Sequence, residues 1–222
     1  MQDMFEEDFS VVDSGGRLRS RYNGMVYTYY LDQDIGMPDE YRDLISTLEN
    51  MQENDTLNLM INSHGGALHT AVAIVNAIRS TRGTVHGVNC GVAISAASCI
   101  FLACHSAEVT AHSSLMAHTG SGIEMGKLSD TSKSIIHAEV QINKFYRDVY
   151  EHFFTEDEIS RILRGEDFWL NDDEICDRLE RRQELEQKAA EENTQYITYD
   201  DLMKMTKKDI LSTLGVQSPD EM

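Results

Sequence analysis

Between residues 25 and 119, segments typical of strands alternate with segments typical of helices, and this order constrains the fold more than any other feature. Strands are expected at residues 25–31, 56–62, 84–90, 107–112 and 114–119, and helices at residues 37–51, 67–80 and 94–104. The helix segments repeat apolar residues every three or four positions, whereas the strand segments are short apolar runs. Because strands joined through helices by short connections form parallel sheets, we predict an α/β fold with helices packed on a mostly parallel sheet.

Three further regions flank this alternation. Residues 1–24 are polar with a double glycine, which predicts an N-terminal arm or axial loop. A helical pattern without proline or glycine runs over residues 128–154, longer than one small core requires, so we expect a projecting helix that meets a partner. Thr155 and Glu158 then form a capping-box pattern. The main domain is expected to span residues 25–194, followed by an acidic and amphipathic tail at residues 195–222.

Composition excludes several classes of function. The chain of 222 residues has a formal net charge of −19, which opposes binding to DNA or RNA phosphates. It contains no apolar run of eighteen residues, and its acidic start lacks the pattern of a signal peptide, so we expect a cytoplasmic protein that spans no membrane. No cysteine pair has C-x-x-C spacing, so the four cysteines are expected to be reduced, buried and structural, without a metal site.

The segment GVAISAAS, residues 91–98, raises the question of catalysis. Ser95 is expected to start a helix after a turn that contains Gly91, where free N–H groups and the helix dipole stabilise negative charge. The glycines of SHGG, residues 63–66, could turn a second N–H group toward the same place. These residues alone leave two interpretations open, because serine is also a common structural N-cap. Ser98 is expected to face the core.

Three motifs decide between these interpretations through a family resemblance. They are INSHGG at residues 61–66, GVAISAAS at residues 91–98 and LMAH at residues 115–118. In this order they resemble ClpP, the proteolytic subunit of the Clp protease, and the helix at 128–154 is similar to the handle helix of that family. The resemblance covers roughly residues 25–175 and implies the ClpP/crotonase-like fold, a βαβ superhelix with a long handle helix.

The resemblance also assigns roles to individual residues. It implies that Ser95 is the nucleophile, His118 the general base and Asp167 the third member of a catalytic triad, with Glu166 as the alternative acid. The backbone N–H groups of Gly66 and Ala96 would form the oxyanion hole. Such an enzyme needs neither a metal nor another cofactor, because its nucleophile is its own hydroxyl group.

The family further implies a homo-oligomer of heptameric rings, one or two stacked through the handle, and a Clp-type AAA+ unfoldase as partner. Its substrates would be unfolded polypeptides in a bacterial cytoplasm or in a phage-infected host cell. Two features depart from the family pattern. Thr119 and Gly120 replace the usual Gln-Pro after the histidine, and residues 176–222 have no matching counterpart. These departures affect the substrate groove and the subunit contacts.

Three alternatives remain at the level of sequence. A catalytically inactive ClpP-like assembly or regulatory subunit would keep the ring without turnover. A crotonase-type acyl-CoA enzyme would share the fold and the paired N–H donors, but it would use carboxylates instead of Ser95 and His118. A related signal peptide peptidase would need a lysine base and usually an anchor, for which the sequence offers no candidate segment.

Overall fold

The computed structural model describes residues 10–12, 18–20, 24–120 and 128–193. It divides the chain into two units, Met1–Arg182 and Gln183–Met222. The predicted tail at 195–222 lies outside the described residues. Most of the predicted N-terminal arm does too, although β1 (Ser10–Val12) and β2 (Leu18–Ser20) form an antiparallel pair there.

A six-stranded sheet forms the centre of the first unit. Along its main path the order is β3-β4-β5-β7-β8, and β6 pairs with the first half of β5. The strands are β3 (Val26–Leu31), β4 (Thr56–Ser63), β5 (Thr84–Ile94), β6 (Ser106–Val109), β7 (Ser114–Ala117) and β8 (Phe168–Asn171). All pairings are parallel except that of β8 with β7, which is antiparallel. The mixed α/β architecture with a mostly parallel sheet confirms the predicted fold class.

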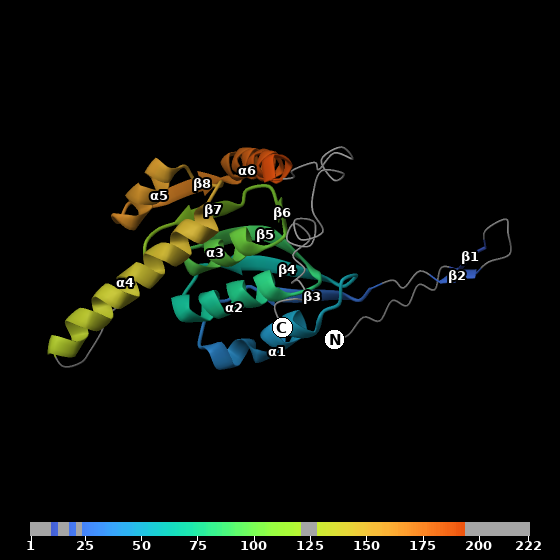
Figure 1. Cartoon of the computed structure of the whole chain (residues 1–222), viewed down its shortest axis with the longest axis horizontal. Coiled ribbons are helices and arrows are strands. Elements are labelled where there is room, and N and C mark those ends of the chain that lie inside the picture. The colour runs from blue at the N-terminus through green and yellow to red at the C-terminus, as the bar shows by residue number, and fades with distance from the viewer. Residues whose placement is uncertain (1–9, 13–17, 21–23, 121–127, 194–222) are drawn as a thin grey trace, which may run out of the picture. The chain divides into compact units, whose positions relative to one another are not determined.

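Helices cover one face of this sheet (Figure 1). After the short 3-10 helix η1 (Pro38–Tyr41) come α1 (Arg42–Asn50), α2 (Leu68–Ser80) and α3 (Ala96–Ala103). Their apolar sides pack on alternate residues of the strands, so that Leu59 and Ile61 of β4 are buried with Ile74 and Ile78 of α2. Removing this apolar surface from water is the main force that holds the layers together.

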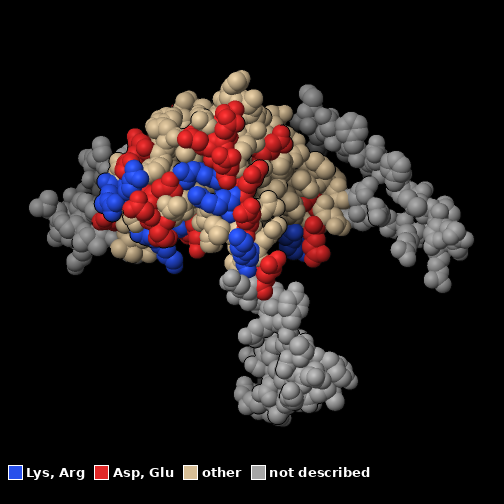
Figure 2. Space-filling model, turned by 90° about the horizontal axis from the view of Figure 1, so that it is seen from above, with Lys and Arg blue, Asp and Glu red and all other residues tan. Residues whose placement is uncertain are grey.

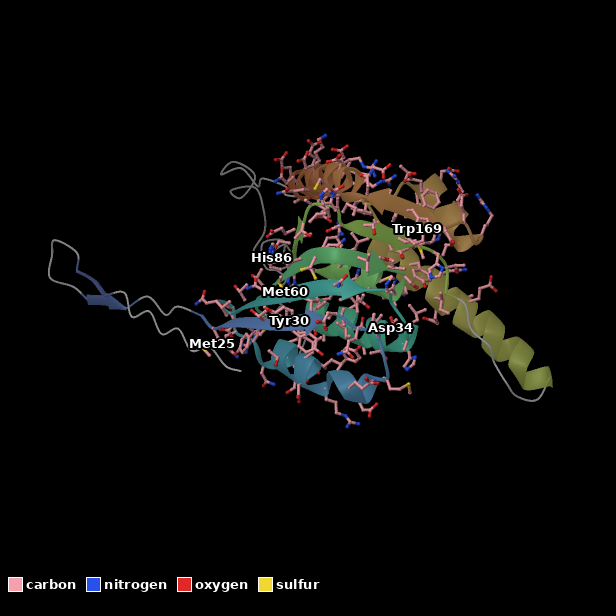
Figure 3. The ribbon with its side chains drawn as sticks, turned by 180° about the vertical axis from the view of Figure 1, so that it is seen from behind. Met25, Tyr30, Asp34, Met60, His86 and Trp169 are labelled. Carbon is pink, nitrogen blue, oxygen red and sulfur yellow. The ribbon has the colours of Figure 1, made fainter. Side chains whose placement is uncertain are left out.

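The other face of the sheet is not covered by α1, α2 or α3. Seen from behind, β3, β4 and β5 lie toward the viewer and carry the labelled side chains of Tyr30, Met60 and His86 (Figure 3). On β3, Val26 is 66% exposed and Tyr30 is 65% exposed. Strands of parallel sheets are ordinarily buried on both faces, so this surface is unusual for a protein that remains alone.

Three local predictions need correction. β5 does not end at residue 90 before a turn through Gly91 but continues to Ile94, because its first half pairs with β6 and its last residues pair with β7. β8 was not predicted, since its four residues are too short to show a period. The handle-like helix α4 (Leu128–Tyr150) ends four residues before the expected residue 154.

The predicted capping box is confirmed at the start of α5 (Glu156–Leu163), where the Thr155 side chain accepts a hydrogen bond from the Glu158 backbone N–H at 3.3 Å. The Glu158 carboxylate also binds Arg178 of α6 (Asp172–Asn193), at 2.7 and 3.0 Å. Figure 2 shows basic side chains interleaved with acidic ones on one face of the molecule. Local pairing of this kind reduces the mutual repulsion expected of a strongly acidic chain.

All four cysteines are free, but they are not all buried as predicted. Cys99 is buried and Cys104 is partly buried, whereas Cys90 and Cys176 are exposed. The prediction was wrong for these two because Cys90 lies on the uncovered side of β5 and Cys176 lies on α6.

None of the described helices is both long enough and apolar enough to cross a lipid bilayer. Within the same part of the chain, no three His, Cys, Asp or Glu side chains are grouped closely enough to hold a metal ion.

Candidate active site

Ser95 occupies a strained turn between β5 and α3. Its backbone has φ 58° and ψ −124°, a region that non-glycine residues rarely adopt. Its N–H group donates a hydrogen bond to the carbonyl oxygen of Met116 in β7, at 2.8 Å. The strand therefore ends abruptly and the helix starts at the next residue, an arrangement that holds the side chain of Ser95 at the carboxyl edge of the sheet. Strain of this kind is common at functional sites.

The glycine turn after β4 lies directly beside Ser95. A β-carbon at Gly65 would lie 2.8 Å from Ser95 Cβ and 2.6 Å from the carbonyl oxygen of Ile94. Gly65 also has φ +93°, so both its conformation and its close contact require glycine. The motif INSHGG thus brings the end of β4 against the turn of Ser95.

Two backbone N–H groups are available near this turn. Ala96 is the first residue of α3, and the first N–H groups of a helix have no acceptor within the helix. Gly66 has φ +143°, and its two neighbours along the chain are hydrogen-bonded to Ile35. The N–H group of Ile35 donates to the carbonyl oxygen of Gly65 at 2.7 Å, and the N–H group of Ala67 donates to the carbonyl oxygen of Ile35 at 2.8 Å. These bonds fix the peptide plane of Gly66, while the dipole of α3 favours negative charge at its start.

His118 directly follows β7 and contacts Ser95. The distance between His118 Nε2 and Ser95 Oγ is 2.7 Å, which is that of a good hydrogen bond. The His118 side chain is 28% exposed, so the ring is partly shielded while one edge remains accessible. The contact arises because β7 pairs in parallel with the end of β5, with Met116 beside Ile94.

The register of the sheet places Asp167 opposite His118. In the antiparallel ladder of β7 and β8, Ala117 pairs with Phe168, so residues 118 and 167 form the next pair beyond it. Asp167 Oδ1 is 3.7 Å from His118 Nδ1, within the range of an ion pair but longer than a hydrogen bond. The Asp167 side chain is 55% exposed.

Glu166, the alternative acid, is engaged elsewhere. Its carboxylate binds the guanidinium group of Arg161, with Arg161 Nε at 2.8 Å from Oε2. The hydrogen bond from Arg161 lowers the pKa of Glu166. Of the two neighbouring acids, only Asp167 therefore lies within ion-pair distance of His118.

A second Ser–His contact shows that hydrogen bonding alone does not make a site. His86 Nδ1 lies 2.8 Å from Ser106 Oγ, on the uncovered face of the sheet. Ser106 is an ordinary strand residue in β6 and does not precede a helix, so no free N–H groups of a helix start accompany it. His64, which the sequence left as a loop or cleft residue, is exposed next to the glycine turn.

A model of the Clp protease family matches residues 32–177, more than half of the 222 residues. The chain belongs to the Clp protease family. This confirms the resemblance deduced from the three motifs. No curated protein sequence matches the chain.

Two solved structures share the fold of this chain. A mutant of ClpP1 from Listeria monocytogenes is similar with a TM-score of 0.56 and 24% identity, over 68% of this chain and 86% of that chain. A peptidase from Plasmodium falciparum is similar with a TM-score of 0.57 and 18% identity, over 68% of this chain and 91% of that chain. At these identities the two structures establish the fold of this Clp protease family member, and its chemistry must be argued from its own residues.

One group of residues behind Ser95 was not predicted from the sequence. Tyr146 and Tyr150 of α4 are fully buried, and the Tyr150 hydroxyl lies 3.2 Å from Ser98 Oγ. Two tyrosines spaced four residues apart on a helix are an available signal, because such residues share one face. Only the packing of α4 on α3 shows that this face lies next to Ser98.

Proposed function

We propose that the protein is a serine endopeptidase of the ClpP type, in which Ser95, His118 and Asp167 form a catalytic triad. The observation that carries this proposal is the 2.7 Å contact between His118 Nε2 and Ser95 Oγ at the start of a helix. A crotonase-type acyl-CoA enzyme is less well supported, because it has no use for a histidine in contact with this serine.

The chemistry follows from the positions of these groups. Ser95 Oγ attacks the carbonyl carbon of the substrate peptide while its proton passes to His118 Nε2. The negative charge that develops on the carbonyl oxygen is stabilised by the N–H groups of Gly66 and Ala96. Collapse of this intermediate breaks the C–N bond, and the leaving amine takes the proton from His118. Water, activated by the same histidine, then hydrolyses the acyl ester and restores Ser95.

Asp167 orients the His118 ring and stabilises its protonated form. Its separation of 3.7 Å from Nδ1 is longer than a working hydrogen bond. Catalytic hydrogen bonds are often long in structures without substrate and shorten in the reacting complex.

A cavity beside the active site offers a place for a substrate side chain. It has a volume of about 260 Å³ and lies between α2 and α4, with Leu68, Val72, Ile142 and Phe145 among its lining residues. Leu68 comes within 3.4 Å of the β-carbon position of Gly120, two residues after His118. Gln141, Lys144 and Asp148 complete the lining, so the cavity would accept a side chain with both apolar and polar parts.

Self-association into heptameric rings, one or two stacked, is part of the same proposal. The uncovered sheet face with Val26 and Tyr30 supports it, because burial against a second copy would remove this exposed apolar surface from water. We further propose that such a ring encloses the active sites, admits unfolded polypeptides, and receives them from a Clp-type AAA+ unfoldase in the cytoplasm. The N-terminal arm and the C-terminal tail as separate segments stay predictions.

A fluorophosphonate probe tests the proposal directly. Wild-type protein should be labelled at Ser95 and should cleave unfolded substrates, whereas Ser95→Ala should lose both properties. A catalytically inactive assembly subunit would form oligomers without labelling, and mass measurement of the native assembly distinguishes this case. Absence of labelling in correctly folded protein would refute the peptidase proposal.

A further inference from the structure

A chain of buried hydroxyl and thiol groups links α4 to the backbone of Ser95. Ser98 Oγ donates a hydrogen bond to the carbonyl oxygen of Ser95, at 2.6 Å. Since the single hydroxyl proton of Ser98 is used in this bond, the Tyr150 hydroxyl donates to Ser98 Oγ across 3.2 Å. The thiol of Cys99 in turn donates to the Tyr150 oxygen at 3.5 Å.

These groups are fully enclosed. Ser98, Cys99 and Tyr150 have 0% exposure, and burial raises the pKa of Tyr150 well above its usual range. The chain of bonds therefore has a fixed direction, from the Cys99 thiol through the two hydroxyls to the Ser95 carbonyl group. A buried hydrogen bond is effective here because water cannot replace either partner.

The end of this chain is the carbonyl group of the residue with the unusual backbone. Ser95 has φ 58°, a conformation that persists only where surrounding contacts hold it. On one side the peptide of Ser95 is fixed by the bond from its N–H to Met116, at 2.8 Å. On the other side, the carbonyl oxygen of Ser95 accepts hydrogen bonds from both the backbone N–H of Ser98, at 3.0 Å, and its hydroxyl group, to which Tyr150 donates.

The same helix also contacts the histidine side of the site. The Tyr146 hydroxyl lies close to Gly120, two residues after His118, because it is 3.3 Å from the position of a β-carbon at that glycine. Tyr146 stacks on Tyr150 with ring centroids 5.5 Å apart, and Tyr150 packs edge-on against Phe154 at 5.3 Å. One aromatic face of α4 thus supports both segments that must meet for catalysis.

We infer that Tyr150, acting through Ser98, is a positioning residue that holds the turn of the proposed nucleophile. The reactivity of Ser95 therefore depends on the position of α4 against α3. The inference rests on the proposed serine chemistry and adds Tyr150, which lies outside the three motifs at residues 61–66, 91–98 and 115–118. Neither Tyr150 nor Ser98 touches the substrate. Their effect should therefore appear in the rate of attack and not in substrate affinity.

The substitution Tyr150→Phe tests this with little loss of packing, because it removes the hydroxyl and keeps the stacked ring. The second-order rate constant for fluorophosphonate labelling should fall roughly tenfold, as should kcat for peptide cleavage, with KM unchanged. Ser98→Ala should have a similar effect. Because both act through one chain of bonds, the double variant should be no slower than the slower single variant.

Ser113→Ala is the matched control. Ser113 is also a buried serine that donates to a backbone carbonyl oxygen, that of Asn89 at 2.9 Å, and its other side-chain partner is Thr110, so these bonds do not involve α4. It should lose stability to a similar extent while its labelling rate stays within about twofold of wild type. Wild-type labelling in the Tyr150→Phe variant, or a double variant slowed by the product of the single effects, would overturn the inference.

A second experiment tests the positioning role of Tyr150 even if the protein is not a serine peptidase. If wild-type protein is not labelled, crystal structures of wild type and Tyr150→Phe still decide the positioning role. The inference requires the carbonyl group of Ser95 to shift when the Tyr150 hydroxyl is removed. An unchanged turn refutes it, whatever reaction the protein catalyses.

Discussion

Replacing Gly65 by alanine is the sharpest test of the packing around Ser95. The new β-carbon would lie 2.8 Å from Ser95 Cβ, 2.6 Å from Ile94 O and 3.0 Å from Ala96 N. All three atoms belong to the strand–turn–helix segment and cannot rotate away as the end of a long side chain could. The turn must therefore move, or the glycine loop must retreat from it.

The cost has two parts. A side chain at φ +93° costs about 1–2 kcal/mol, and forcing extra volume into a packed site costs about 1–3 kcal/mol more. We expect Gly65→Ala to lower the free energy of unfolding by about 2–5 kcal/mol. Displacing Ser95 by about 1 Å should also slow its labelling roughly 100-fold.

Gly165→Ala separates the two parts of this cost. Gly165 has φ +99°, but a β-carbon there meets nothing within 4 Å, so this variant should lose only about 1–2 kcal/mol. Urea unfolding of both variants, with fluorophosphonate labelling of Gly65→Ala, measures the difference. Equal destabilisation of the two variants, together with wild-type labelling of Gly65→Ala, would show that the turn is not packed as described.

Three other substitutions or modifications have defined outcomes. Asp167→Asn should reduce kcat/KM by a factor of about 10⁴ whereas Glu166→Gln should have little effect, and steady-state kinetics that reverse this order would exchange the two roles. The hydrogen bond from Arg178 holds the pKa of Glu158 at about 2, below its usual value of 4.5. The ion pair therefore stabilises the folded protein fully above pH 4.5, and this contribution is lost as the pH falls toward 2. Glu158→Gln should cost about 1 kcal/mol in urea unfolding at pH 7 and progressively less under acid conditions; a constant difference would exclude the ion pair as its cause. Burial raises the pKa of Cys99 to about 12. Iodoacetamide at pH 8 should therefore modify the exposed Cys176 in the folded protein, but Cys99 only after unfolding. Mass spectrometry of the peptides would show which cysteine is modified.

The sequence predicted those features that depend on local pattern. The alternation of strands and helices gave the α/β class, and the spacing of Thr155 and Glu158 gave a helix start that the structure contains. The motifs also identified Ser95 and His118, each within two residues of the end of a predicted element, and residues at the carboxyl ends of parallel strands gather at one edge of the sheet. Continuation of β5 through Gly91 escaped prediction, since it depends on pairing with β7, which lies distant in the sequence.

The strand register of the sheet and the packing of the helices determined the features that the sequence did not predict. Asp167 lies opposite His118 only because β8 returns antiparallel to β7 with Ala117 beside Phe168, and four residues carry too little pattern to reveal such a pairing. The link from Tyr150 to Ser95 likewise needs α4 to pack against α3. Local sequence determines which elements form, because propensity and periodicity act over a few residues. The meeting of serine, histidine and carboxylate depends on contacts between segments far apart in the chain, and these form only when the whole sheet assembles.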